Sequence, residues 1–592
     1  MGGASATEQF LLPWLLTPAL ALTEALPLTM MPAAGRLAEV PTLGGVMRVS
    51  EAAGHTLAQL DVRCFFGLIG SGNFHLANAL VASGASFVAA RHETGAVTMA
   101  DAYARVSGHL GVVTVHQGPG LTNALTGLTE AAKSRTPLLL LAADTSATAR
   151  LSNFWIDQAG LAASVGALYR RLSSPRSAVA EIAEAARTAV VERRAVLLSL
   201  PLDVQAGECE PPTDLAALAS PAGDPASPDD VASLARILVG ARRPLLLAGR
   251  GAVLAEAREE LERLADQTGA LLTTSAVAAG LFTGNPWSLG MSGGFASPLA
   301  AELIAAADVV VAFGASLNMW TTSRGHLIGP KAVVAQIDLD PNALGMHRRV
   351  DLAIAGDARA TATALVEALG SRRVPGWRTT ELMAQLRTGR WRDQPFEDRS
   401  TDEHIDPRAF SRALADLLPA DHTLAVDSGH FMGWPAMYLD VPDGHAFVFT
   451  QAFQSIGLGL STGIGAAIAR PDRLTVIALG DGGALMALPE IETLGRLRLD
   501  ALVVVYNDAA YSAEVHHFAP EGAQMETVRF PDTDFAALAR AVGVEAVTVR
   551  SPADLSAVGD WLKRGRTRPF LVDAKILPTV VADWLHEAFQ GH

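Results

Sequence analysis

A glycine-rich run, Gly480-Asp481-Gly482-Gly483, follows an almost wholly apolar stretch at residues 474–479. A second apolar stretch at 502–506 ends at Asn507. Both stretches are typical of buried parallel strands, and a helix is expected between them at 489–497. Ligands of such sheets bind at the carboxyl ends of the strands, where glycine lets the backbone approach a phosphate and a helix N-terminus favours negative charge. The sequence therefore predicts a diphosphate site at this edge.

The same strand ends carry oxygen ligands for a metal ion. Asp481 offers a carboxylate, Asn507 an amide oxygen and Ala509 a backbone carbonyl. Mg²⁺ needs few protein oxygens when a diphosphate supplies the others. These three residues are therefore the predicted metal ligands.

A second group of polar residues stands far from the first in the sequence. Residues 87–96 are expected to form a short strand that runs into a helix, with Glu93 at the junction. The next strand, at 111–115, leads into His116-Gln117-Gly118-Pro119-Gly120-Leu121-Thr122-Asn123. On its own, Glu93 is also explained as a helix-start carboxylate that interacts with the macrodipole.

Together, the two groups resemble the pyrimidine-binding and diphosphate-binding domains of the thiamine diphosphate enzymes related to acetolactate synthase, pyruvate decarboxylase and benzoylformate decarboxylase. The resemblance covers nearly the whole chain after about residue 45. It is strongest for acetolactate-synthase-like members, in which His-Glu before a helix of small residues, and Gly-Pro-Gly before Thr-Asn, occur in this order. The resemblance implies thiamine diphosphate and Mg²⁺ as cofactors.

The resemblance also implies roles for single residues. A glutamate at position 93 would bond the aminopyrimidine ring and favour the tautomer that removes the thiazolium proton, so the base acts through proximity as well as basicity. Ile456 matches the apolar residue that holds the cofactor bent, and His430, in Asp427-Ser428-Gly429-His430, is a candidate phosphate contact. The other residues expected to bind the cofactor are Gly118, Pro119, Asn123, Gly480, Asp481, Gly482, Gly483 and Asn507.

Substrate chemistry depends on a few positions near these groups. His116 stands where benzoylformate-decarboxylase-like proteins have a histidine and many acetolactate synthases have a small residue, so it is a candidate acid or base, with Gln117 beside it. His75 is a further candidate, because it lies in the loop that faces the substrate in the family. Ile456 stands where acetolactate synthases have Met. The departures at 116 and 456 leave strict pyruvate-to-acetolactate activity open.

We therefore predict an enzyme that cleaves a 2-oxo acid and transfers the resulting acyl carbanion to a carbonyl acceptor. The alternatives are a non-oxidative decarboxylase that releases an aldehyde, a thiamine-dependent hydrolase or oxidase, and a cofactor-binding pseudoenzyme. A pseudoenzyme is expected to lose Glu93 or the metal ligands, and this chain keeps them. Because the two groups lie on different domains, the resemblance implies a homodimer or homotetramer with shared active sites.

The domain plan follows from composition and strand pattern. Within 592 residues we predict three α/β domains, each a doubly wound parallel sheet. They are a pyrimidine-binding domain at 45–202, a central domain at 231–370 and a diphosphate-binding domain at 405–592, with linkers at 203–230 and 371–404 and an extension at 1–44. In the central domain, Gly249-Arg250-Gly251 lacks the rest of a dinucleotide fingerprint. Some acetolactate synthases carry FAD in this domain; the sequence leaves FAD open but has no decisive motif that indicates it.

Composition limits the partners. Charged residues make up 18% of the chain and hydrophobic residues 49%, which is typical of a globular protein with a large core. With 46 Lys and Arg against 61 Asp and Glu, no basic excess favours nucleic acid. The apolar stretch at 10–31 is interrupted by three prolines and a glutamate, so neither a signal peptide nor a membrane helix is expected. Two isolated cysteines fit a reducing cytoplasm, which is the predicted location.

Overall fold

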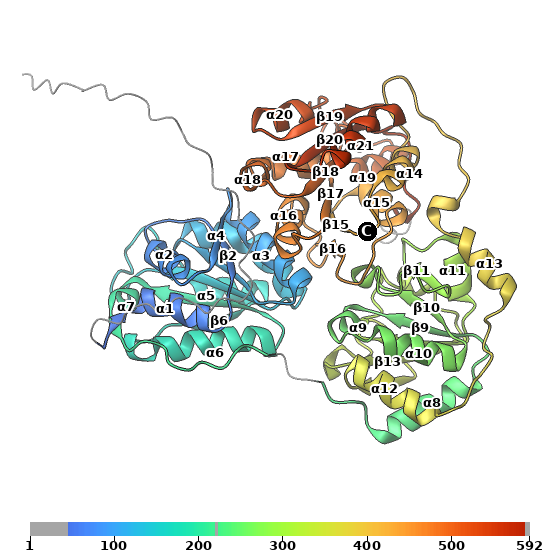
Figure 1. The fold of residues 1–592 in the computed structure, drawn as a ribbon, viewed down its shortest axis with the longest axis horizontal. Coiled ribbons are helices and arrows are strands. Elements are labelled where there is room, and N and C mark those ends of the chain that lie inside the picture. Colours follow the sequence, from blue (N-terminus) through green and yellow to red (C-terminus); the bar gives the residue numbers. More distant parts are fainter. Residues whose placement is uncertain (1–44, 220–222, 586–592) are drawn as a thin grey trace, which may run out of the picture. The chain divides into compact units, whose positions relative to one another are not determined.

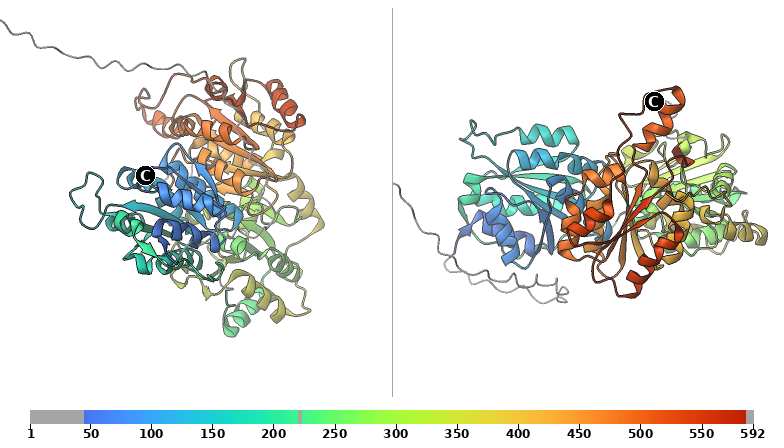
Figure 2. Two further views of the ribbon diagram at one scale, coloured as in Figure 1. Left: turned by 60° about the vertical axis from the view of Figure 1, so that its left-hand side comes forward. Right: turned by 90° about the horizontal axis from the view of Figure 1, so that it is seen from above.

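The computed structural model describes residues 45–219 and 223–585, so the extension expected at 1–44 lies outside the described residues. Three α/β domains follow one another along the chain, in the order blue, green and red in Figure 1. Each is built on a six-stranded sheet whose strands all pair in parallel. Helices cover both faces of the sheets (Figures 1 and 2), which confirms the predicted fold class.

The N-terminal sheet has the strand order β3-β2-β4-β5-β7-β6. Its central strands are buried along their whole length, which explains why they are continuous apolar runs. The strands are β2 (Cys64–Gly67), β3 (Ser86–Ala89), β4 (Gly111–Val115), β5 (Leu138–Asp144), β6 (Leu168–Arg171) and β7 (Ala195–Pro201). The helices are α1 (Val49–Gln59), α2 (Phe74–Ala82), α3 (Glu93–Ser107), α4 (Pro119–Lys133), α5 (Gln158–Val165), α6 (Ala178–Val191) and α7 (Leu202–Ala206).

The segment expected as the first linker contains regular structure at both ends. Helix α7 begins at Leu202, and β8 (Glu208–Cys209) then pairs antiparallel with β1 (Met47–Arg48). At the other end, α8 (Pro228–Gly240) begins before residue 231, because the Ser227 side chain caps it and proline occupies its first turn. The chain between these elements is correspondingly shorter than the predicted 203–230.

The central sheet has the order β11-β10-β9-β12-β13-β14. Gly249 and Gly251 follow β9, and a Cβ at either position would overlap the backbone of Gly314 at the end of β12. These two glycines are therefore explained by close packing of neighbouring turns. The strands are β9 (Pro244–Ala248), β10 (Leu271–Thr274), β11 (Ser288–Met291), β12 (Val309–Phe313), β13 (Val333–Asp338) and β14 (Leu352–Ala355). The helices are α9 (Arg250–Leu254), α10 (Arg258–Thr268), α11 (Pro298–Ala305) and α12 (Ala358–Leu369), and α13 (Thr380–Thr388) lies in the expected second linker.

The C-terminal sheet, with the order β16-β15-β17-β18-β20-β19, repeats the topology of the N-terminal sheet. Counted within each domain, the strands of both sheets are in the order 2-1-3-4-6-5. The strands are β15 (His422–Val426), β16 (Phe447–Phe449), β17 (Leu474–Gly480), β18 (Ala501–Asn507), β19 (Glu545–Val549) and β20 (Phe570–Lys575). The helices are α14 (Pro407–Leu417), α15 (Gly433–Tyr438), α16 (Gly459–Ala469), α17 (Asp481–Met486), α18 (Glu490–Leu497), α19 (Ser512–Phe518), α20 (Phe535–Ala541) and α21 (Ser556–Lys563).

Helices α3 and α16 join the two outer domains. A Cβ at Gly465 would overlap the carbonyl of Met99, so glycine allows the two helices to approach closely. Leu460 and Ile464 belong to the same buried core as Met99. In the part of the chain that the structure describes, no helix is both long and apolar enough to cross a bilayer.

Candidate functional site

The glycine-rich run lies at the carboxyl end of β17, next to the end of β15, where the strand order of the C-terminal sheet reverses. A Cβ at Gly482 would lie 2.6 Å from the Tyr511 ring, and one at Gly483 would overlap the Asp427 carboxylate. Packing therefore requires glycine at both positions. Sheets of this kind bind ligands at such a reversal point.

Two carboxylates face a cavity beside these glycines: that of Asp481 is buried and that of Asp508 is half-buried. Asp481 and Asp508 both line a cavity of about 1510 Å³. Burial, together with the nearby Asp508, raises the pKa of Asp481 to about 7, and burial raises the pKa of Asp508 to about 6. Two acids withdrawn from water side by side are costly unless a cation neutralises them. Their oxygens fit a hard divalent ion.

Protein atoms alone do not complete a metal site. Within the described ranges, no group of three or more His, Cys, Asp and Glu side chains is placed to hold an ion. Mg²⁺ commonly takes one or two carboxylates from the protein and its remaining oxygens from phosphates and water. The donor set therefore fits a metal that arrives with a diphosphate.

Asn507 and Ala509, two of the predicted metal ligands, are engaged elsewhere. The Asn507 amide donates to Asp573 Oδ1 at 3.0 Å, and its Oδ1 accepts from Ala509 N at 3.2 Å. The Ala509 carbonyl accepts from Phe530 N at 2.8 Å. Asn507 ends β18, and because side chains alternate along a strand, the next residue, Asp508, is directed to the other side. Asp508 and Ala510, each one residue further along the chain, line the cavity, whereas Asn507 and Ala509 do not.

His430 presents an unpartnered donor to the same cavity. Its Nε2 accepts from Ala582 N at 2.9 Å, while burial and the neighbouring His516 lower its pKa to about 3. The ring is therefore neutral and carries its proton on Nδ1. Among the described residues, this buried Nδ1 has no hydrogen-bond partner. A donor of this kind fits an oxygen acceptor such as a phosphate.

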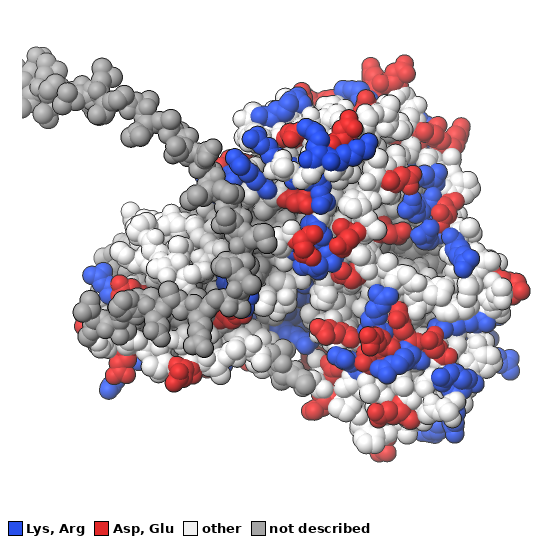
Figure 3. Space-filling model, viewed as in Figure 1, with Lys and Arg blue, Asp and Glu red and all other residues white. Residues whose placement is uncertain are grey.

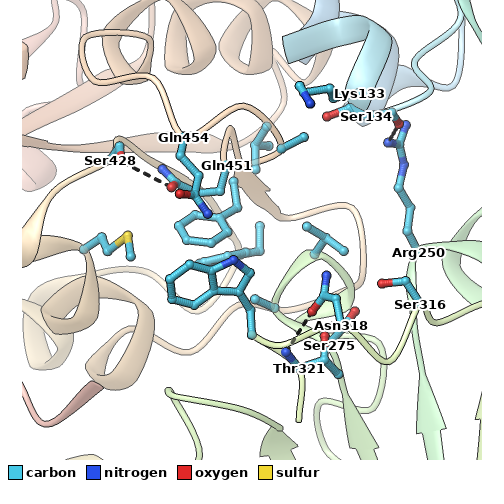
Figure 4. Close-up of a pocket in the computed structure, with 18 of the residues that line it drawn as sticks. Lys133, Ser134, Arg250, Ser275, Ser316, Asn318, Thr321, Ser428, Gln451 and Gln454 are labelled. Carbon is cyan, nitrogen blue, oxygen red and sulfur yellow. Dashed lines mark hydrogen bonds between the residues drawn. The ribbon is translucent and has the colours of Figure 1, made fainter. Parts of the chain in front are cut away.

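Ile456 lies on a loop that borders the cavity. Its side chain is 38% exposed and lines the cavity wall. The loop turns at Gly457, whose φ is 88° and whose N–H donates to both oxygens of the buried Asp427 at 3.1 Å. Figure 4 shows the nearby Gln451 bonded to Ser428 at this wall. Asp427 thus fixes one end of the loop.

Glu93 and His116 form a separate group in the N-terminal domain. Glu93 is half-buried, and its Oε2 accepts from Asn123 Nδ2 at 3.0 Å. His116 Nδ1 lies 2.8 Å from the Gln117 carbonyl, which fixes its proton there and leaves Nε2 as the basic atom, 3.3 Å from Ser71 Oγ. A Cβ at Gly120 would meet His116 at 3.2 Å and Glu93 at 3.5 Å. Glu93, His116 and Asn123 are therefore neighbours.

The remaining predicted residues of this domain have different positions. Gly118 has a φ of 67° and packs on the backbone of Phe154, and Pro119 begins α4. Gln117 is buried against Gly72, with Oε1 unpartnered in the described structure. His75 is exposed on α2 and touches the Phe74 ring. No described contact joins His75 to Glu93 or His116.

The structure does not bring the two groups together within one chain. The cavity wall contains Asp481, Asp508, His430 and Ile456, whereas none of its described lining residues is Glu93, His116 or Asn123. One chain therefore presents two incomplete half-sites.

Sequence reasoning overlooked several carboxylates in and around the candidate site. Asp508 directly follows the predicted ligand Asn507, and its charged carboxylate suits a divalent cation better than the neutral Asn507 amide does. Asp427, Glu130 and Glu490 gave no local signal, since each acts through backbone N–H groups distant in sequence.

Comparison with known proteins covers all three domains. The N-terminal thiamine pyrophosphate (TPP) binding domain of the thiamine pyrophosphate enzymes matches residues 47–161, the central domain matches 231–365, and the C-terminal TPP binding domain matches 427–574. A probable 2-ketoarginine decarboxylase of Pseudomonas aeruginosa is 31% identical over 539 residues, which cover 88% of this chain and 92% of that protein. A sulfoacetaldehyde acetyltransferase of Castellaniella defragrans is 29% identical, with 88% and 90% covered. A probable acetolactate synthase large subunit of Methanocaldococcus jannaschii is 26% identical, with 90% and 92% covered.

Proposed function

This chain belongs to the thiamine pyrophosphate enzymes, and we propose that it uses thiamine diphosphate and Mg²⁺ to cleave a 2-oxo acid and transfer the acyl group to a carbonyl acceptor. The observation that carries the proposal is the pair of carboxylates with raised pKa values, Asp481 and Asp508, at a glycine-lined cavity. When bound, the thiazolium ring supplies the carbon that accepts the acyl group as carbon dioxide leaves. The chain's own residues bind this group, orient it and move its protons.

Each half-site has a distinct task in this proposal. In the C-terminal domain, Asp481, Asp508 and the Ala510 carbonyl would hold Mg²⁺, and His430 Nδ1–H would donate to the diphosphate. Ile456 would support the ring system from the cavity wall. In the N-terminal domain, Glu93 would exchange a proton with the aminopyrimidine ring while Asn123 orients its carboxylate.

Two copies of the chain would complete the site. The N-terminal domain has exposed apolar side chains: Phe154, whose ring contacts that of His116, is 43% exposed, Trp155 beside it in the sequence is 47% exposed, and Phe74 at the start of α2 is 52% exposed. In Figure 3 the surface over α2 and α4 of this domain carries few charges. Around the cavity loop, Phe453 and Met486 are 44% and 55% exposed. Apolar surfaces at both half-sites support a symmetric dimer or pair of dimers, in which Glu93 of one subunit serves the cavity of the other.

Transfer to a carbonyl is supported by the acetyltransferase and synthase names among the relatives. The cavity of about 1510 Å³ is also larger than the roughly 300–1,000 Å³ of common ligand sites. It therefore has room for more than the cofactor.

The second candidate is a decarboxylase that releases an aldehyde. One relative is named a probable decarboxylase, and His116 Nε2 is positioned as a proton carrier beside Ser71. On either assignment, His116→Ala should lower turnover by roughly ten- to a thousandfold while cofactor binding persists.

Product analysis separates the two candidates. Protein with thiamine diphosphate and Mg²⁺ is incubated with a panel of 2-oxo acids, alone and with aldehydes, sulfoacetaldehyde or a second 2-oxo acid. Carboligation predicts acyloin or 2-hydroxy-2-acyl products whenever an acceptor is present. Aldehyde as the only product of every combination would assign the protein to the decarboxylases.

A further inference from the structure

A buried glutamate of the C-terminal domain binds the backbone just before Glu93. Glu490, at the start of α18, is 2% exposed, and its Oε1 accepts from Arg91 N at 2.9 Å and from His92 N at 3.1 Å. Its other oxygen accepts from Thr493 Oγ1 at 2.7 Å. A Cβ at Gly95 would lie 2.6 Å from Oε1, so glycine allows the carboxylate to reach these amides.

A buried glutamate of the N-terminal domain makes the opposite contact. Glu130, near the end of α4, is 1% exposed, and its two oxygens accept from Ala452 N at 3.2 Å and from Phe453 N at 2.7 Å. These amides belong to the loop that carries Ile456. Glu130 thus fixes the end of the loop opposite to the end held by Asp427.

A cationic network holds Glu130 in place. Arg105 donates to Glu130 Oε1 at 2.9 Å and to the Phe449 carbonyl at 3.2 Å, and it also pairs with Asp101 at 2.7 Å. Arg250 of the central domain bonds the carbonyl of Ser134, and Figure 4 shows it extending towards that residue. The central domain thus bonds Ser134, whose side-chain hydroxyl donates to the Glu130 carboxylate.

The two contacts are equivalent in the related topologies of the outer domains. Each domain supplies one buried carboxylate to two successive amides of the other, a few residues before a side chain assigned to the cofactor. Burying a carboxylate is costly unless several donors satisfy it, so these contacts are specific structural features. We propose that Glu490 and Glu130 form a reciprocal clamp: they are positioning residues that set Glu93 and the Ile456 loop, respectively.

The clamp rests on the cofactor-binding part of the proposed function and is independent of the choice between carboligase and decarboxylase. Its first test is hydrogen–deuterium exchange of the metal-free and cofactor-free protein. The amides of residues 91–92 and 452–453 are followed, with strand amides of β5 and β18 as internal references for global opening. Titration calorimetry with thiamine diphosphate and Mg²⁺ then measures affinity in the same variants.

Substitution by glutamine should have different effects at the two glutamates. A glutamine at 490 keeps Oε1 for both amides, and its NH₂ can donate to Thr493 Oγ1, so Glu490→Gln should retain the exchange protection of the amides at 91–92. Glu490→Ala should lower that protection by about ten- to a hundredfold. At 130, both oxygens accept from N–H groups, so Glu130→Gln should place an NH₂ against a donor. The Glu130→Gln variant should lose exchange protection of the amides at 452–453 and should bind thiamine diphosphate about tenfold more weakly.

Matched controls share the surroundings without the amide contacts. Asp101→Asn alters the same buried network around Arg105, and Glu492→Gln alters the ion pair to the Arg91 side chain. Both should leave the amides as protected, relative to the references, as in the wild type. The clamp is overturned if Glu490→Gln behaves like Glu490→Ala, if Glu130→Gln keeps 452–453 protected, or if Asp101→Asn reproduces the Glu130→Gln result. Failure of the wild type to bind thiamine diphosphate would instead remove the proposed function and leave the exchange result standing.

Discussion

The two half-sites stand at the ends of sheets with the same strand order, yet one has a single acid and the other has two acids at one cavity. In the N-terminal domain, Glu93 is half-buried and accepts from the neutral Asn123 amide. In the C-terminal domain, Asp481 is buried and lies near the half-buried Asp508, and loss of hydration raises the pKa of both carboxyl groups. The difference teaches that this topology selects where a ligand binds, whereas the immediate surroundings of the carboxylates select the chemistry. A single carboxylate beside a neutral amide suits proton exchange, and two carboxylates with raised pKa values at one cavity suit a metal.

The largest expected effect tests the accessible acid. Glu93→Gln should slow deuterium exchange at the thiazolium carbon of bound thiamine diphosphate by at least about a hundredfold, because a positioned base is typically worth that much. Cofactor affinity should change little, since the metal ligands lie in the other half-site. The exchange rate is followed by NMR, and affinity by calorimetry.

Asn123→Ala is the control for this variant, because it removes the partner of Glu93 and keeps the carboxylate. It should have the smaller effect on exchange. Equal losses in the two variants, or unchanged exchange in Glu93→Gln, would remove Glu93 from the role of base.

A matched pair of substitutions at the end of β18 tests the two carboxylates that line the cavity. Asp508→Ala should weaken Mg²⁺-dependent binding of thiamine diphosphate by about ten- to a hundredfold or more, as loss of a supporting metal contact alone costs that much. Asn507→Ala should lower stability while the Mg²⁺ dependence persists, because its amide bonds only protein groups. If instead Asn507→Ala abolished the Mg²⁺ dependence and Asp508→Ala kept it, Asn507 would be the metal ligand, as the sequence predicts.

Much of this comparison was accessible from sequence. The apolar run at 111–115 has the predicted bounds in β4, and the runs at 474–479 and 502–506 end within one residue of the bounds of β17 and β18, because buried parallel strands are continuous and their turns are marked by glycine and polar residues. The glycine-rich run and Glu93 were found for the same reason, since each follows such a strand directly.

Other features depend on contacts that no local pattern encodes. The choice between Asn507 and Asp508 follows from the side on which a strand's last side chain lies, and that is decided by partners such as Asp573 on another strand. The exposure of His75 follows from the way α2 packs. Glu130 and Glu490 act on amides in a different domain, so only the fold reveals them.

Subunit mixing tests whether the two half-sites serve each other between chains. Glu93→Gln and Asp508→Ala proteins are each expected to be inactive. After exchange of subunits, about half of the dimers are mixed and one of their two sites is intact, so roughly a quarter of wild-type activity should return. Mass spectrometry verifies the exchange. Complete inactivity of verified mixed dimers would require sites contained within one chain.

The smallest effect concerns stability without cofactor. Burial, with the nearby Asp508, places the folded pKa of Asp481 at about 7, above the ordinary 3.8, so the folded state holds this proton more tightly than the unfolded state. The resulting stabilisation is present below about pH 4 and is lost as the pH rises through about 7. Asp481→Asn resembles the protonated form. In metal-free protein near pH 8 it should therefore raise the free energy of unfolding by about 1–3 kcal/mol, and near pH 4 it should have almost no effect.

Glu93→Gln is the control, and it should leave the free energy of unfolding nearly unchanged at both pH values. Thermal unfolding of the three proteins in the presence of a chelator measures these differences. If Asp481→Asn destabilised the metal-free protein at pH 8, the protein itself would already stabilise the charged Asp481 carboxylate. The difference between the acids of the two half-sites would then not hold.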